Sequence, residues 1–106
     1  FTGHTDRVFS VAVDQSGNVY SGSGDDTVKK IDSSGNELWS YSTGGSRVSS
    51  VNVDQLGNVY AGLVENKEVI KLGSNGNILW TFTGHTDNVW AGLAVEPGLY
   101  GAGFWQ

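Results

Sequence analysis

The sequence predicts an all-β protein built from repeated four-stranded antiparallel meanders, and two observations support this fold class. Glycine occurs 16 times in 106 residues, serine, asparagine and aspartate are also frequent, and good helix formers are few. The chain also repeats itself at a shift of 40 residues, because RVFSVAVDQSGNVYSG at residues 7–22 matches RVSSVNVDQLGNVYAG at residues 47–62. A period of about 40 residues is typical of β-propeller blades, so the chain is predicted to form one propeller domain or part of one.

The four strands of one repeat follow from alternation and turn chemistry. In the first repeat, Phe9, Val11 and Val13 alternate with small side chains, which is the period of a strand with one buried face. The DQSGN segment that follows predicts a hairpin turn, because glycine and asparagine tolerate a positive φ. Further strands are predicted at residues 18–23, 27–32 and 37–43, and the second repeat has the same pattern.

The repeat divides the chain into a first blade at about residues 1–41, a second at about residues 42–82 and a half-blade at residues 83–106. The third copy is recognisable because FTGHTDNV at residues 82–89 differs from FTGHTDRV at residues 1–8 in one position. About two and a half blades cannot close a ring, since propellers have at least about four blades. We therefore expect a homo-oligomer, a dimer or a trimer, whose copies complete the ring by head-to-tail contacts.

The run GHTDRVFSVAVDQSGNVYSGSGDDTVKKID at residues 3–32 resembles a WD-repeat blade. This resemblance implies a hydrogen-bonded structural tetrad, in which His4, Ser21 and Asp25 take three of the four places. Ile31 stands at the place of the tetrad tryptophan. His85 is the repeat equivalent of His4 and is expected to make a structural hydrogen bond of the same kind.

The stretch GNVYSGSGDDTVKKIDSSGNELWSYSTGG resembles a quinoprotein-like (PQQ-type) blade, in which glycine and tryptophan near the end of the fourth strand lock neighbouring blades together. Trp39 and Trp80 stand at matching places in the two fourth strands, so we expect both to be buried between blades. Trp90, Phe104 and Trp105 lie in the third copy and do not match that position. We expect them to contact another chain, with packing inside the chain or stacking on a glycan as the alternatives.

The sequence predicts no catalytic residue, metal site or cofactor. The chain has no cysteine, and His4 and His85 are equivalent positions two blades apart, which one subunit cannot bring together. Ser10 follows His4 closely, but no third group is placed to orient the histidine as in a catalytic triad. The aspartate-containing turns lack the several spaced carboxylates of a calcium loop. A non-catalytic protein is therefore expected.

The net charge and the hydropathy of the chain disfavour nucleic acids and membranes as partners. Eleven acidic residues against six basic ones give a net charge of −5, which disfavours DNA and RNA. No apolar stretch approaches the ~18 residues of a membrane span, and no signal-peptide pattern is present. We expect a soluble chain, processed, designed or cut from a longer propeller, and its compartment is not indicated.

Two classes of function fit these observations. The first is a self-assembling propeller fragment that acts as a structural or protein-interaction module. The alternative is a ligand-binding propeller, with a site for a glycan or a quinone-like small molecule at the channel mouth or between blades.

Overall fold

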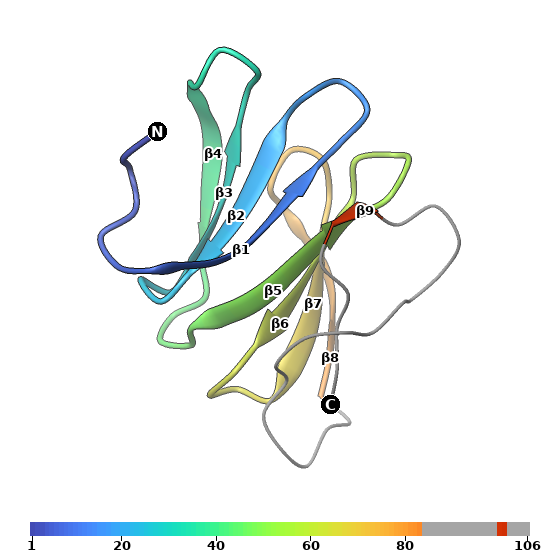
Figure 1. Cartoon of the computed structure of the whole chain (residues 1–106). Coiled ribbons are helices and arrows are strands. Elements are labelled where there is room, and N and C mark those ends of the chain that lie inside the picture. The colour runs from blue at the N-terminus through green and yellow to red at the C-terminus, as the bar shows by residue number, and fades with distance from the viewer. Residues whose placement is uncertain (84–99, 102–106) are drawn as a thin grey trace.

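The computed structural model describes residues 1–83 and 100–101, which form two antiparallel sheets. The first sheet, here called blade 1, has four strands in chain order, and the second, blade 2, has four strands with a fifth at one edge (Figure 1). Blade 1 consists of β1 (Val8–Val13), β2 (Val19–Ser23), β3 (Thr27–Ile31) and β4 (Glu37–Ser42). Blade 2 consists of β5 (Val48–Val53), β6 (Val59–Leu63), β7 (Glu68–Leu72) and β8 (Ile78–Phe82), and β9 (Tyr100–Gly101) pairs with β5. The predicted all-β class with four-stranded antiparallel meanders is confirmed.

The two blades have the same internal register. Val11 pairs with Ser21 and Val13 with Val19 in blade 1, and the positions one repeat later pair in the same way in blade 2. Both innermost strand pairs also contain a bulge at the equivalent place, after Val8 and after Val48. The sequence repeat is therefore a repeat of backbone geometry.

The main hydrophobic core lies between the blades. Ala12, Tyr20 and Val28 of blade 1 pack against a buried, largely β-branched face of blade 2. That face consists of Val48, Val51, Val53, Val59, Ala61, Leu63, Ile70 and Leu72. β1 lies beside β5, where the Val51 N–H donates to Ser10 Oγ at 3.2 Å and joins the blades (Figure 1).

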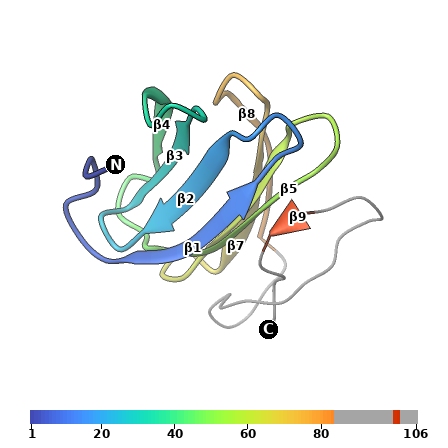
Figure 2. The same cartoon turned by 45° about the horizontal axis from the view of Figure 1, so that its top comes forward.

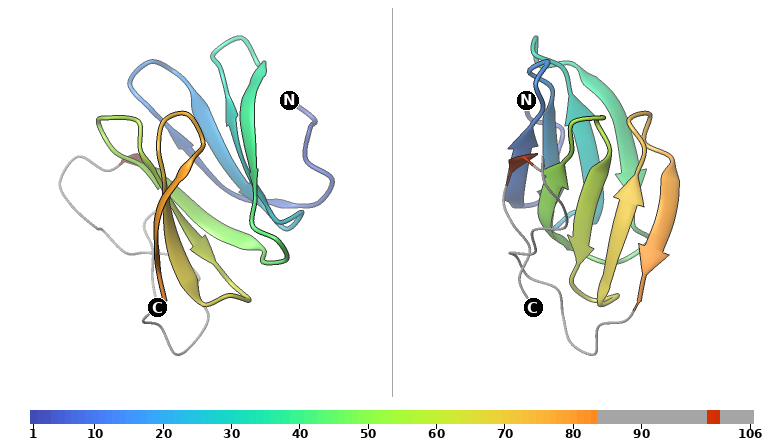
Figure 3. Two further views of the ribbon diagram at one scale, coloured as in Figure 1. Left: turned by 180° about the vertical axis from the view of Figure 1, so that it is seen from behind. Right: turned by 90° about the vertical axis from the view of Figure 1, so that its right-hand side faces the viewer.

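The two faces of blade 1 have different surroundings. One face is covered by blade 2, whereas among the described residues the other is accompanied only by the N-terminal segment, which lies on the side away from blade 2 (Figure 2). We call this second face the open face. The right-hand view of Figure 3 shows the strands of blade 2 side by side, from β5 to β8 in chain order, with β9 beyond β5.

Most of the predicted half-blade, residues 83–106, lies outside the described residues, so it stays a prediction. Within it, Tyr100–Gly101 forms β9 and pairs antiparallel with β5, opposite Val53 and Asn52. This pairing extends blade 2 at its inner edge, which the sequence did not indicate. The described residues contain no helix long and apolar enough to cross a membrane.

Candidate functional site

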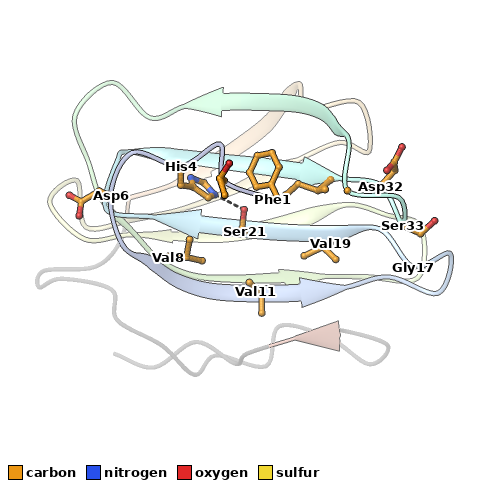
Figure 4. Close-up of a pocket in the computed structure, with 13 residues that line it drawn as sticks. Phe1, His4, Asp6, Val8, Val11, Gly17, Val19, Ser21, Asp32 and Ser33 are labelled. Atoms are coloured by element: carbon orange, nitrogen blue, oxygen red, sulfur yellow. Dashed lines mark hydrogen bonds between the residues drawn. The ribbon is translucent and has the colours of Figure 1, made fainter.

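The open face of blade 1 exposes apolar side chains that the repeat would place in a core. Val11 and Val13 are 53 % and 50 % exposed, whereas their equivalents in blade 2, Val51 and Val53, are fully buried. Val11, Val19 and Ile31 line a hollow of about 680 Å³ on this face, and Figure 4 labels Val11 and Val19 among the lining residues. The open face therefore has the composition of a blade-to-blade contact, but no blade formed by the described residues covers it.

A polar network borders the hollow, and Figure 4 shows two of its three predicted members, His4 and Ser21, joined by a hydrogen bond. His4 Nδ1 lies 2.8 Å from Asp25 Oδ2, and His4 Nε2 lies 2.6 Å from Ser21 Oγ. Because an ionised carboxylate only accepts hydrogen bonds, His4 Nδ1 is the donor to Asp25. The side chains of His4 and Asp25 are nearly fully buried, so the network ties the N-terminal segment to β2 and the following turn.

Further hydrogen bonds hold Asp25 in the turn between β2 and β3. The Thr5 N–H donates to Oδ2 at 3.0 Å, and the Thr27 N–H and hydroxyl both donate to Oδ1. Burial acts to raise the pKa of Asp25, but the hydrogen bonds from Thr27 and His4 outweigh it and hold that pKa well below the ordinary 3.8. Asp25 is therefore a charged structural acceptor.

Replacing Asp25 by Asn is expected to lower the free energy of unfolding by about 2 kcal/mol at neutral pH, because hydrogen bonds to a buried charge are lost. Folding depresses the pKa of Asp25, so this stabilisation is present above the unfolded-state value near 3.8 and is lost as the pH falls toward the lower folded-state value. Urea denaturation of both proteins at neutral and acidic pH measures the difference. A difference that stays constant as the pH falls would refute the charged role of Asp25.

In blade 2, an ion pair stands where blade 1 has the contact between His4 and Asp25. Gly44 takes the place of the histidine, and Glu65 stands at the place of Asp25. Glu65 forms an ion pair with Arg47, whose Nη2 lies 2.7 Å from Glu65 Oε2, and it also accepts the Arg47 N–H at 2.7 Å. Both side chains are over 40 % exposed, so this pair is worth less than the buried network of blade 1.

The order of the Ser21–His4–Asp25 hydrogen bonds matches that of a serine-hydrolase triad, but the surroundings differ from an active site. Ser21 is almost fully buried and lies within β2, paired with β1 on one side and β3 on the other. Backbone N–H groups in such a strand bond to neighbouring strands and are not directed at an oxyanion. Among the described residues, no group of three or more histidines, cysteines or carboxylates is placed to hold a metal ion.

The structure places the two tryptophans of the fourth strands differently. Trp39 is half-buried against the inter-blade core, and its Nε1 donates to the Ser74 carbonyl of blade 2 at 3.0 Å. Trp80 is 42 % exposed, so its expected burial is not seen within one chain. The reason is positional, since blade 2 lies beside Trp39 and no further described blade lies beside Trp80. Packing of Trp80 between blades stays a prediction.

The other predicted site residues, His85, Trp90, Phe104 and Trp105, lie outside the described residues. Sequence reasoning, in turn, missed a repeated hydrogen-bonded unit. In each blade an aspartate in the first turn accepts a hydrogen bond from a tyrosine hydroxyl, from Tyr20 to Asp14 at 2.7 Å and from Tyr60 to Asp54 at 3.0 Å. Its signal is present in the sequence as an aspartate and a tyrosine six residues apart in both repeats.

A match to a known family falls on this site. Residues 1–32 match the family model of the WD domain, G-beta repeat. The matched segment includes all three residues of the His4–Ser21–Asp25 network and ends just after β3. It supports a WD-repeat-like blade at this position. No curated protein matches the chain in a sequence search.

Proposed function

We propose that the chain is a non-catalytic protein-interaction module, a self-assembling β-propeller fragment that binds through the open face of blade 1. The WD-repeat match at residues 1–32 supports an interaction role, because propellers of this kind present blade faces and loops to other proteins. The buried state of His4 and Asp25 supports a structural role for the polar network.

The exposure of Val11 and Val13 is the observation that favours this function. The equivalent valines of blade 2 are fully buried beneath blade 1. In blade 2, a neighbouring blade therefore covers the face that is open in blade 1. Removing apolar surface from water contributes about 25 cal/mol per Å², which favours covering the open face in the same way. Head-to-tail contact between copies would supply such a cover.

The apparent melting temperature is expected to rise with protein concentration, because a partner that binds only the folded chain stabilises it by mass action. Circular dichroism melts over about a hundredfold range of concentration measure this shift. A melting temperature independent of concentration would contradict self-assembly.

The second candidate function is binding of a small molecule in the hollow on the open face. Its volume of about 680 Å³ lies within the range of about 300–1,000 Å³ that small-molecule sites occupy. A quinone-like ligand or a glycan is the chemistry to test, by titration and on a glycan array. Saturable binding abolished by Val19→Asp would favour this candidate, and absence of binding would remove it.

A further inference from the structure

Each blade contains a cluster of one tyrosine, one lysine and one tryptophan, and the two clusters have almost the same geometry. In blade 1, Lys30 Nζ lies 5.4 Å from the centre of the Tyr20 ring, and that ring lies 6.4 Å from Trp39 at an angle of 55°. In blade 2 the lysine is Lys71, at 5.2 Å from the Tyr60 ring, and Trp80 lies 6.3 Å from Tyr60 at 57°. The side chains of both clusters are therefore arranged for the same contact.

The blade 1 cluster shows what that contact is. Trp39 Nε1 and Lys30 Nζ both donate to the Ser74 carbonyl, at 3.0 and 3.3 Å, in the turn between β7 and β8. The indole also covers Gly76 of that turn so closely that a Cβ added there would lie 2.7 Å from the ring. The first cluster thus binds a β-turn of the following blade, through its carbonyl and its glycine.

The blade 2 cluster has no such turn among the described residues. Neither Lys71 nor Trp80 has a described backbone acceptor that corresponds to Ser74, and every residue of β8 is exposed. The Trp80 indole N–H and the Lys71 ammonium group are therefore available for a turn from elsewhere.

A second turn of the right shape exists in the same chain. The turn between β3 and β4 closes with a 2.8 Å hydrogen bond from Asp32 N–H to the Asn36 carbonyl, the same distance as in the occupied turn. Its Gly35 has a φ of 90°, against 87° for Gly76. Apart from Gly35 and its two chain neighbours, no residue has an atom within 4 Å of a Cβ built on Gly35, so this turn is open where the other is covered.

We propose that Trp80 and Lys71 of one copy bind the 32–36 turn of a second copy, with both side chains donating to the Ser33 carbonyl and the indole covering Gly35. This inference rests on the proposed self-assembly and specifies its register. Charge favours the second copy, because the open turn carries Asp32 where the occupied turn has Gly73. The Asp32 carboxyl has a pKa below its usual range through hydrogen bonds from its own turn, so it is ionised and attracts Lys71.

The contact is heterologous, since one end of each copy supplies the cluster and the opposite end supplies the turn. A chain can therefore use both ends at once, which allows a closed ring of copies. The face of blade 2 that carries Lys71 and Trp80 is already buried in its inner part, at Ser50, Asn52 and Tyr60. On blade 2, the cluster that makes the new contact therefore lies on the outer strands β7 and β8.

A photo-crosslinking experiment tests this register. We replace Trp80 by p-benzoylphenylalanine in one sample and Trp39 in a control, and irradiate mixtures of isotopically light and heavy chains. The position 80 sample is expected to give light–heavy dimers crosslinked to residues 32–36, while the control gives crosslinks to residues 73–77 within one chain. Crosslinks from position 80 to any other region, or within one copy, would overturn the proposed register.

Affinity measurements provide a second readout that separates the two proposals. Trp80→Ala is expected to weaken self-association by about 30-fold, as for a tryptophan at the centre of an interface, and Leu79→Ala on the same exposed strand to change it little. If the chain associates but both variants associate like the original, the register is wrong and self-assembly stands. If the original chain does not associate at all, both proposals fail.

Discussion

Replacing Val51 by Asp is expected to prevent folding, because the new carboxylate would lie unpaired in the core between the blades. Val51 is fully buried there, against the apolar side chains of blade 1. Burying a charge without a partner costs several kcal/mol, which is comparable to the total stability of about 5–15 kcal/mol that a domain possesses. The far-ultraviolet circular dichroism spectrum of the variant should be that of an unfolded chain.

The repeat offers a matched control at the equivalent position of blade 1. Val11→Asp places the same charge on the open face, where the side chain is 53 % exposed and a carboxylate keeps its water. This variant should keep the spectrum of the original chain and lose self-association. Equal loss of structure in both variants would show that the open face is part of the core of a single copy.

Replacing Trp39 by Ala is expected to lower the free energy of unfolding by about 3 kcal/mol, the lower end of the range for large aromatic residues, because the side chain is half-buried. The change removes the indole from the inter-blade core and its hydrogen bond to the Ser74 carbonyl. Urea denaturation at low protein concentration measures this loss.

Trp80→Ala is the matched variant, and in the same dilute conditions it should cost at most about 1 kcal/mol, since exposed side chains contribute less. Its effect should appear instead in self-association. A cost for Trp80→Ala as large as that for Trp39→Ala would mean that both tryptophans are covered within one copy.

The strands and their order could be predicted because they depend on local patterns. Alternating valines and the repeated DQSGN and DQLGN turns specify a meander without reference to distant residues. The exposure of Trp80 could not be predicted in this way. Equivalent positions in a repeat share their own strand, but their environment depends on which blade lies beside them. Trp39 has blade 2 beside it, and Trp80 has no described blade there.

The candidate site was predictable only in part for a similar reason. The family resemblance pointed to His4, Ser21 and Asp25, whose side chains meet as hydrogen-bond partners. It did not indicate that Thr27 also donates a hydrogen bond to Asp25, because the hydrogen bond from the Thr27 hydroxyl depends on the shape of one tight turn. The count of about two and a half blades implied that a blade face stays uncovered at each end, but it did not indicate that Val11 is exposed, since Val11 and Val51 occupy identical places in the repeat.

Sedimentation equilibrium of the unmodified chain at micromolar concentration tests self-assembly most directly. The open face of blade 1 and the exposed outer strand of blade 2 predict a folded species whose mass is a multiple of 11.3 kDa and falls on dilution. A folded species that stays at 11.3 kDa throughout this range would contradict the proposal that copies of the chain cover one another's blades.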